Sequence, residues 1–487
     1  MGSPNLLFIF TDEQRADTMA AYGNTKIQTP NLDRLARQSV LFERAYVTQT
    51  VCTPSRSTLL TGLYPHTNGC VENNLPLRPD TPCLPEMLPP GRWATGYHGK
   101  WHLGDEIFAQ HGFEEWRGIE DAYAGYYGPG RDRNARSAYH HWLIEQGVRP
   151  QNGSAFGRGE AARLPEHLGK PAFLARTASD FIRRHRAEPF VLFVNFLEPH
   201  MPFFGPRDAQ HAPGSVDLPA NFGAPPTVRQ PLKTRMMQRH YEEKGFGGPL
   251  RSEDDWRGLI ARYWGLCSLV DTHVGAILRT LEECGLDDKT IVVYTSDHGD
   301  MMGSHRLLAK CVQFEEAARV PMMIRLPGQR DGRRVAAPVS HIDMIPTLLD
   351  LLDAPAPPHL QGRSLRPELE GRASAPRDVV FEWNGMNNGM GDKLGGVSLS
   401  DSMTALATPE QAVAAIGDPV RSIVSPDGWK LNCSPLGEHE LYNLNEDPIE
   451  TRNLYGQPET RAVAARLRQG LAQWQERTAD AVSLPAM

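Results

Sequence analysis

The segment NLLFIFTDE, residues 5–13, begins with a short apolar run rich in strand-forming residues and ends in two carboxylates. Runs of this length are typical of strands buried in parallel sheets. Three later runs have the same character: FVLFVNFL at 190–197, IVVYTS at 291–296 and VPMMIRL at 320–326. Helical patterns lie between the runs, at 29–46, 252–284 and 341–353. Strands that alternate with helices predict an α/β layered domain.

The C-terminal part of the chain has a different pattern, which begins at about residue 370. Strand-like pieces follow one another closely at 378–383, 420–424, 428–432 and 440–444, and a helical pattern covers 460–478. This spacing favours a helix packed on an antiparallel sheet. We therefore expect a large α/β domain over residues 1–370 and a smaller C-terminal α+β subdomain over residues 371–487.

Two segments lack a regular pattern and are rich in glycine, proline or arginine. They cover residues 201–250 and 385–397. Long loops in compact enzymes are often lids or walls that set specificity. A surface excursion without a role is the other interpretation, and the sequence leaves both open.

The 487-residue chain has an ordinary globular composition, with 40% hydrophobic and 22% charged residues. Its net charge of −7 argues against a nucleic-acid binder that relies on a basic surface. No segment reaches the roughly 20 apolar residues of a membrane span, and the N-terminus does not resemble a signal peptide. The seven cysteines are odd in number and scattered. These features predict a reduced, cytoplasmic protein with no membrane or nucleic-acid partner.

Acidic residues directly follow two of the predicted strands. Asp12 and Glu13 follow the first run, and Asp297 and His298 follow IVVYTS. Open α/β sheets bind ligands at the carboxyl ends of their strands. Three carboxylates and one imidazole suit Ca²⁺, Mg²⁺ or Mn²⁺, and the histidine favours Mn²⁺ more than an all-oxygen site would. The alternative is that each acid only ends its strand as a turn residue.

The segment VCTPSRSTLLTG, residues 51–62, places Cys52 just before a predicted helix. A cysteine that feels a helix N-terminus and a nearby arginine has a stabilised thiolate. A cysteine phosphatase would need an arginine six positions after the cysteine, and that position is Thr58. From these residues alone, a small buried cysteine is the simpler interpretation.

The eleven positions from Cys52 to Gly62 resemble the signature of the sulfatase family, in which a maturation enzyme converts the motif cysteine to Cα-formylglycine. Other blocks appear in that family's order: TDEQRAD at 11–17, HGKWHLG at 98–104, EPHMPF at 198–203, SDHGDMMGSHRLLAK at 296–310 and ELYNLNEDPIETRNL at 440–454. The resemblance covers about residues 5 to 455. It implies an alkaline-phosphatase-like fold, in which helices sandwich a large mixed, mostly parallel sheet.

The resemblance also implies a metal site and a covalent mechanism. One divalent ion, Ca²⁺ or Mn²⁺ ahead of Mg²⁺, would be held by Asp12, Glu13, Asp297, His298 and a diol oxygen of the formylglycine made from Cys52. The metal would lower the pKa of that oxygen and orient it as the nucleophile. The covalent intermediate would then expel sulfate and regenerate the aldehyde.

The remaining catalytic residues follow from the same motifs. Arg56 would hold the diol and balance negative charge, and Lys100 and Lys310 would bind the sulfuryl oxygens. His200 would protonate the departing alcohol, and His102 would deprotonate the second diol hydroxyl.

Some neighbouring residues have less definite roles. Asn73 lies where related enzymes often place a substrate-contacting amide, and a turn residue is the alternative. His305 either faces the site or has a capping or packing role. A structural role is expected for His66, His98, Cys70, Cys83 and Cys311.

Two departures from the commonest pattern bear on the substrate. Glu13 stands where many members have an aspartate, and His298 stands where many have an asparagine. The Asp-His pair and the missing signal peptide resemble phosphonate monoester hydrolases and cytosolic arylsulfatases. Hydrolysis of small sulfate esters is therefore the leading prediction, and hydrolysis of phosphonate monoesters or phosphodiesters is the alternative. The alternative from a different class of function is a metal-binding scaffold in which Cys52 stays unmodified and no ester is hydrolysed. A homodimer or homotetramer is consistent with cytosolic relatives.

Overall fold

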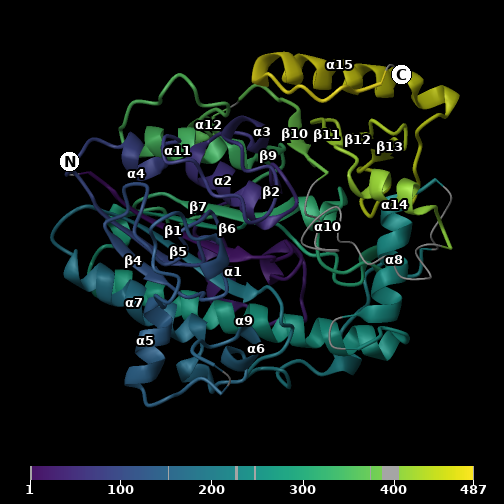
Figure 1. Cartoon of the computed structure of the whole chain (residues 1–487). Helices are drawn as coiled ribbons and strands as arrows, with labels where there is room; N and C mark the ends of the chain where they lie inside the picture. The colour runs from purple at the N-terminus through teal and green to yellow at the C-terminus, as the bar shows by residue number, and fades with distance from the viewer. Residues whose placement is uncertain are drawn as a thin grey trace.

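The computed structural model describes residues 3–151, 153–224, 229–245, 248–372, 374–385 and 405–485. They form a large α/β unit and a smaller unit built on a second sheet (Figure 1). None of the helices in this described part of the chain is long and apolar enough to cross a membrane.

The main sheet is mixed and mostly parallel, as predicted. Its strands are β1 (Asn5–Asp12), β2 (Val40–Tyr46), β3 (Ala94–Gly99), β4 (Glu115–Gly118), β5 (Phe190–Pro199), β6 (Thr290–Ser296), β7 (Arg319–Arg325), β8 (Arg333–Val335) and β9 (Val339–Ser340). The order is β4-β3-β5-β1-β6-β7-β2-β8, with β9 paired to β2. The antiparallel partner is β7, which pairs with β6 on one side and β2 on the other.

The first apolar run forms β1, the central strand, which pairs in parallel with both β5 and β6. Its side chains alternate between two buried cores. Leu6, Phe8 and Phe10 join one core, and Leu7 and Ile9 join the other. A strand covered on both faces is apolar at every position, which explains why its sequence does not alternate with polar residues.

Helices cover both faces of this sheet. The helices α7 (Lys170–Arg184) and α9 (Glu253–Glu283) pack on one face, and α2 (Cys52–Thr61) and α11 (Met344–Leu351) pack on the other (Figure 1). The other helices of the main unit are α1 (Pro30–Ala36), α3 (Pro65–Asn68), α4 (Leu84–Met87), α5 (Ala138–Glu145), α6 (Arg158–Ala161), α8 (Leu232–Lys244), α10 (Glu315–Ala318) and α12 (Arg366–Leu369).

The second sheet is antiparallel and has the order β10-β11-β12-β13. Its strands are β10 (Val379–Glu382), β11 (Arg421–Val424), β12 (Trp429–Cys433) and β13 (Glu440–Asn443), and α14 (Pro409–Ile416) precedes β11. The C-terminal helix α15 (Arg461–Thr478) lies across this sheet at the top of the view in Figure 1. Leu467, Leu471 and Trp474 of α15 pack on Ile423 and Leu431 of the sheet.

Charged contacts join the two units. Lys430 of β12 is fully buried, and its Nζ lies 3.1 Å from Glu315 Oε1 of the main unit and 2.8 Å from Glu450 Oε1 of its own unit. His66 of α3 meets Glu382 of β10 through Nδ1 and Oε2, 2.5 Å apart. These contacts fix the second sheet against the main unit.

Two predictions about elements need correction. The helix expected over 29–46 ends at Ala36, and residues 40–46 form β2 because Leu41 and Phe42 pair with β7. The irregular segment 201–250 carries the helix α8. Apart from Gly385, the glycine-rich segment 385–397 lies outside the described residues.

Candidate active site

Four adjacent parallel strands deliver the predicted site residues to one edge of the main sheet. In the order β3-β5-β1-β6, Lys100 follows the first, His200 the second, Asp12 ends the third and Asp297 follows the fourth. Parallel strands end at the same edge, so residues distant in sequence meet there. Cys52, the first residue of α2, lies at the same place.

Four groups form a buried cluster of metal-type donors. One ligand atom each of Asp12, Cys52, Asp297 and His298 lies within 4.8 Å of the others. Cys52 Sγ lies 3.1 Å from His298 Nε2 and 3.7 Å from Asp12 Oδ1. This donor set suits a divalent cation, because it consists of two carboxylates, one imidazole and the side chain of residue 52.

Arg56 neutralises both carboxylates of this cluster. It lies one turn after Cys52 on α2 and is completely buried. Its Nη2 donates to Asp12 Oδ2 at 2.9 Å, and its Nε donates to Asp297 Oδ2 at 2.8 Å. Its Nη1 donates to the Lys100 carbonyl oxygen and to Asn195 Oδ1, at 2.7 and 2.9 Å. Arg56 therefore ties α2 to β1, β5 and the loops after β3 and β6.

Two lysines lie on either side of the cluster and bind different carboxylates. Lys100 Nζ donates to Asp12 Oδ2 at 2.5 Å, and Lys310 Nζ donates to Glu13 Oε2 at 2.9 Å. Glu13 therefore lies outside the four-donor cluster and beside Lys310. His200 Nε2 is 3.4 Å from the same Glu13 oxygen, so Glu13 contacts both an expected anion-binding lysine and the expected acid.

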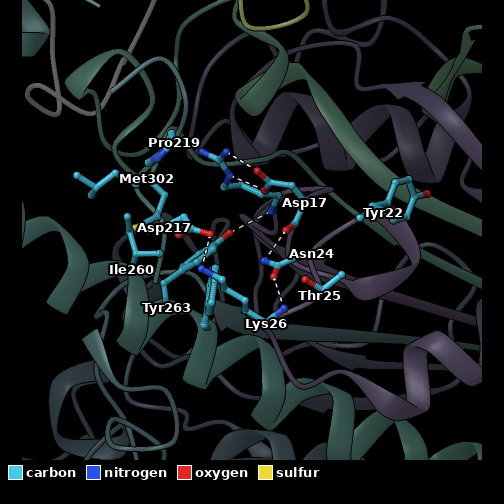
Figure 2. A pocket seen from close by; sticks show the side chains of 14 residues that line it. Asp17, Tyr22, Asn24, Thr25, Lys26, Asp217, Pro219, Ile260, Tyr263 and Met302 are labelled. Carbon is cyan, nitrogen blue, oxygen red and sulfur yellow. Dashed lines mark hydrogen bonds and ion pairs between the residues drawn. The ribbon is translucent and has the colours of Figure 1, made fainter. Parts of the chain in front are cut away.

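A cavity of about 340 Å³ has Tyr263 in its wall, and Figure 2 shows this residue with its neighbours. The charged residues of the cavity pair with one another, Arg15 with Asp17 and Lys26 with Asp217. Tyr263 in its wall donates its hydroxyl to the Glu13 carbonyl oxygen at 2.6 Å. Because Glu13 has a φ of 71°, which non-glycine residues seldom adopt, this contact helps to fix a costly backbone conformation.

The charges of the site shift the pKa values of its central groups. Burial alone would raise the pKa of Asp12, but Lys100, His200 and Arg56 lower it well below its usual range. Burial and Asp12 act to raise the pKa of the Cys52 thiol, and Lys310 and Lys100 outweigh them and lower it. The environment therefore favours negative charge at the side chain of residue 52, beside a concentration of cations.

Both expected proton-transfer histidines are buried and neutral. Burial, followed by the field of Lys310, lowers the pKa of His200 well below its usual range. Burial, followed by the field of Lys100, lowers that of His102 in the same way. His102 Nε2 lies 2.9 Å from Asn74 Oδ1, and its Nδ1 has no partner among the described residues. A neutral imidazole with a free nitrogen is in the form that a base requires.

The two adjacent asparagines have different positions. Asn73 Oδ1 accepts from the backbone N–H of Thr53 at 3.0 Å, in the first turn of α2. Asn74, which the sequence analysis did not select, is the one that contacts the ring of His102. The predicted amide thus supports the helix that carries Cys52, and its neighbour orients the expected base.

Three further residues at the site were missed. Asn195 lies within β5, where a strand pattern gives no sign of a polar contact to Arg56. The Tyr123 ring lies tilted against the His102 ring, with ring centres 4.5 Å apart, and its centre is 5.9 Å from Lys100 Nζ. Glu106 accepts from the backbone N–H of His102 at 2.6 Å, and burial raises its pKa to about 7. In the sequence, the only sign of these contacts was the position of Glu106, four residues after His102.

Residues of less definite role lie around the site. His305 stacks on Phe314 with ring centres 4.2 Å apart, which is a packing contact. The other residues expected to be structural are buried or half-buried and do not belong to the four-donor cluster, namely His66, His98, Cys70, Cys83 and Cys311. Of these, Cys311 lies nearest to it, because it follows Lys310 and packs on Val51, the residue before Cys52.

The chain belongs to the sulfatase family, because the family model described as Sulfatase matches residues 4–354. Two curated relatives are similar over nearly the whole chain. The uncharacterized sulfatase YidJ of Escherichia coli is 27% identical, with 99% of this chain and 88% of the relative covered. The choline-sulfatase of Rhizobium meliloti is 27% identical, with 94% and 83% covered.

A solved structure extends the likeness to a neighbouring enzyme class. The phosphonate monoester hydrolase of Silicibacter pomeroyi aligns with a TM-score of 0.79 at 23% identity, covering 98% of this chain and 96% of the other. At this identity the likeness shows the shared fold. The predicted alkaline-phosphatase-like architecture and the family resemblance are both confirmed.

Proposed function

We propose that this protein hydrolyses sulfate monoesters to an alcohol and inorganic sulfate, with Cys52 converted to Cα-formylglycine. The observation that supports this most is the position of Cys52. Its Sγ lies 3.1 Å from His298 Nε2, inside a buried cluster of metal-type donors and within the fields of Lys100 and Lys310. The hydroxyls of a hydrated aldehyde at this position would supply the nucleophile.

A divalent metal ion, Mn²⁺ or Ca²⁺ ahead of Mg²⁺, would be held by Asp12, Asp297, His298 and the converted residue 52. When bound, it would supply Lewis acidity that favours the ionised hydroxyl. Glu13 would belong to the metal site through its contact with Asp12 and His200, with which it forms a second close group. Because Lys310 already binds Glu13 Oε2, we propose that the main role of the Glu13 carboxylate is to orient Lys310.

The two lysines would bind the sulfuryl oxygens. Lys100 and Lys310 approach the cluster from separate loops, and each is held by a single carboxylate contact. Neighbouring carboxylates and Cys52 raise the pKa of both lysines against the effect of burial, so both stay protonated. Fixed cations around a buried anion stabilise the charge that develops in the transition state. Arg56 would hold the carboxylates of Asp12 and Asp297 in place through one hydrogen bond to each.

The histidines would move the protons. His200 would donate a proton to the departing alcohol oxygen. A bound anion would offset the field of Lys310 that lowers the pKa of His200, so substrate binding would favour the protonated acid. His102, held neutral, would accept a proton from the second hydroxyl at residue 52. Asn73 would contribute by supporting the start of α2, in addition to any substrate contact.

Hydrolysis of phosphonate monoesters or phosphodiesters is the second candidate. The pair Asp297 and His298 and the structural likeness to a phosphonate monoester hydrolase favour it. A sulfate monoester, a phosphonate monoester and a phosphodiester each carry one negative charge. The same cationic side chains can therefore bind all three esters, so the shape of the surrounding walls must decide which ester is preferred.

A formylglycine-generating maturation enzyme is the partner that this function requires. All seven cysteines are unpaired in the structure, which supports a reducing compartment such as the cytoplasm. A homodimer or homotetramer is our proposal for the assembly, by analogy with cytosolic relatives.

The test compares kcat/KM for one aryl leaving group carried on sulfate, on a phosphonate monoester and on a phosphodiester. The protein is co-expressed with a maturation enzyme and loaded with Mn²⁺ or Ca²⁺ in separate samples. We expect the highest kcat/KM for the sulfate ester. A preference for either phosphorus ester would establish the second candidate, and no turnover of any ester by protein with converted Cys52 would contradict both.

A further inference from the structure

Three side chains with donor atoms of the kind that bind zinc lie together outside the proposed active site. They are Cys83, Glu86 and His111, and one ligand atom of each lies within 4.8 Å of the others. Zn²⁺ prefers thiolate and imidazole ligands, whereas Mg²⁺, Ca²⁺ and Mn²⁺ prefer oxygen ligands. The donor types of this cluster therefore suit a different ion from the one proposed at the active site.

The spacing of the three groups is close to that of ligands around one ion. Glu86 Oε2 lies 3.2 Å from His111 Nδ1, and the same oxygen accepts from the Cys83 backbone N–H at 2.9 Å. Zinc bonds of about 2.0–2.3 Å in a tetrahedral arrangement place neighbouring ligand atoms about 3.3–3.7 Å apart. Small side-chain adjustments can therefore bring all three donors onto one ion.

Two of the three side chains are already held in place by their surroundings. Cys83 is completely buried in the core on one face of the main sheet. The side chain of His111 is only 5% exposed, and its ring stacks on Trp101 with ring centres 5.9 Å apart. Ligands that are ordered before binding lose little conformational freedom when an ion arrives.

The balance of charge also favours a divalent cation. In the described part of the chain, His111 is the one ion-pair partner of Glu86. A doubly charged ion, a thiolate, a carboxylate and a neutral imidazole sum to zero, so the complex avoids the cost of an uncompensated buried charge. Burial and Glu86 raise the pKa of the Cys83 thiol. Binding must therefore release a proton, and the affinity for the ion should rise with pH.

One side of the cluster faces a large cavity. Glu86 and His111 both line this cavity, which has a volume of about 900 Å³. Zinc with three protein ligands keeps a fourth position for water or another small ligand, and the cavity gives room for it. The wall also includes Asn74, which contacts the ring of His102, the proposed base.

We propose that Cys83 Sγ, a carboxylate oxygen of Glu86 and a ring nitrogen of His111 bind one Zn²⁺, with water in the fourth position. The ion ties α4, which contains Glu86, to the segment before β4, which contains His111. It thereby fixes part of the wall of the large cavity. Binding of this ion does not depend on the proposed hydrolysis, and its test does not use turnover.

Cobalt spectroscopy tests the site, because a cobalt–thiolate bond gives a near-ultraviolet charge-transfer band. The full chain with Cys52→Ala is the reference, so that an ion at the other donor cluster has no thiolate ligand. Co²⁺ is added to this protein and to versions that also carry Cys83→Ala or Cys70→Ala. Cys70 is an equally buried cysteine of the same core and is the matched control.

We expect the band in the reference protein and in the version with Cys70→Ala, and its loss with Cys83→Ala. Added Zn²⁺ should displace Co²⁺ and bleach the band. A reference protein without the band would overturn the proposal, as would a band that survives Cys83→Ala. Loss of the band in the Cys70→Ala control would also contradict it.

Competition between the two ions then tests the other ligands. In the Cys52→Ala protein, His111→Ala and Glu86→Gln should each weaken Zn²⁺ binding by on the order of 100-fold, because even residues that only support zinc ligands contribute about 10–100-fold. Melting curves without metal show whether each variant is folded. Zn²⁺ affinities equal to that of the reference in both folded variants would overturn the assignment of the three ligands.

Discussion

Two buried clusters of opposite charges lie beside the main sheet, and they differ in what occupies the centre. At the junction of the two units, the ammonium of Lys430 lies between Glu315 and Glu450. At the edge of the main sheet where we propose the active site, Lys100 binds Asp12 Oδ2, and the atoms that converge beside Cys52 Sγ are Asp12 Oδ1 and His298 Nε2. Buried charge alone therefore does not mark the active site. In our proposal, the active site is marked by the metal-type donors that converge on Cys52.

The sharpest test of this difference replaces the residue at the catalytic centre. Cys52→Ala is expected to reduce turnover by on the order of 10⁵-fold or more, because it removes the proposed nucleophile. The melting temperature should change little, because Cys52 contributes a small side chain to a cluster held by Arg56. Cys70→Ala, at a buried cysteine elsewhere, is the control and should keep activity. Near-normal turnover of Cys52→Ala would contradict the mechanism.

A matched pair of lysine variants separates the two clusters. Lys430→Met should lower the free energy of unfolding by about 3–5 kcal/mol, since it leaves two buried carboxylates without their cation. Its kcat per folded molecule should stay near that of the wild type. Urea denaturation and active-fraction kinetics measure the two quantities.

Lys100→Met should reduce catalytic activity more than it reduces stability. It removes a cation from the proposed position of the sulfuryl group, and kcat/KM should fall by about 10²–10³-fold. Some stability will also be lost, because Asp12 loses one of its partners. If Lys100→Met lowered stability while sparing kcat/KM, the two clusters would not differ in function as we describe.

Strands with a local apolar pattern could be predicted from the sequence, and strands defined by pairing with distant segments could not. The runs that form β1, β5, β6 and β7 were recognised because strands covered on both faces are continuously apolar. The strand β2 was taken for helix, because Glu43 and Arg44 interrupt its apolar pattern and its identity comes from pairing with β7. Short edge strands such as β8, which reads RRV, carry no local signal.

The site was predictable to the level of motifs but not of contacts. The two acidic strand ends were correctly expected to meet, and they do so because β1 and β6 pair in parallel, which brings Asp12 and Asp297 to one edge. The strand β3, which leads to Lys100, was not predicted. The partners of each side chain were not predictable. Lys310 binds Glu13 from 297 positions away, and the adjacent Asn73 and Asn74 have different partners. Such pairings depend on loop conformations, among them the positive φ angles of Glu13 and His102.

The two histidines at the catalytic edge should differ in their dependence on the leaving group. His200→Ala should reduce kcat/KM by about 10²–10⁴-fold for poor leaving groups and much less for good ones, because the acid matters most where the alcohol is basic. His102→Ala should affect the whole series equally, because it acts at a different proton. The slope of log kcat/KM against leaving-group pKa measures this. Parallel slopes for both variants would remove the assignment of His200 as the acid.

The smallest effect is expected from a histidine at the junction. Burial acts to lower the pKa of His66, and its contact with Glu382 outweighs this and raises it. The folded state then binds the proton more tightly than the unfolded state. This stabilisation is complete below the ordinary histidine pKa of about 6.5 and is lost as pH rises through the raised value.

We expect His66→Gln to lower stability by on the order of 1 kcal/mol at low pH and by less at high pH. Urea midpoints for the wild type and the variant at pH 6 and pH 9 check the prediction. A difference between the two proteins that grows with pH would have the wrong sign.

The central claim is that Cys52 becomes the nucleophile of a hydrolase. The most direct test plots kcat for an aryl sulfate against the fraction of Cys52 converted, measured from the mass of its peptide in preparations with different amounts of maturation enzyme. We predict a straight line through the origin, with the aldehyde mass at residue 52 accounting for all activity. Turnover that does not depend on the converted fraction would contradict the claim.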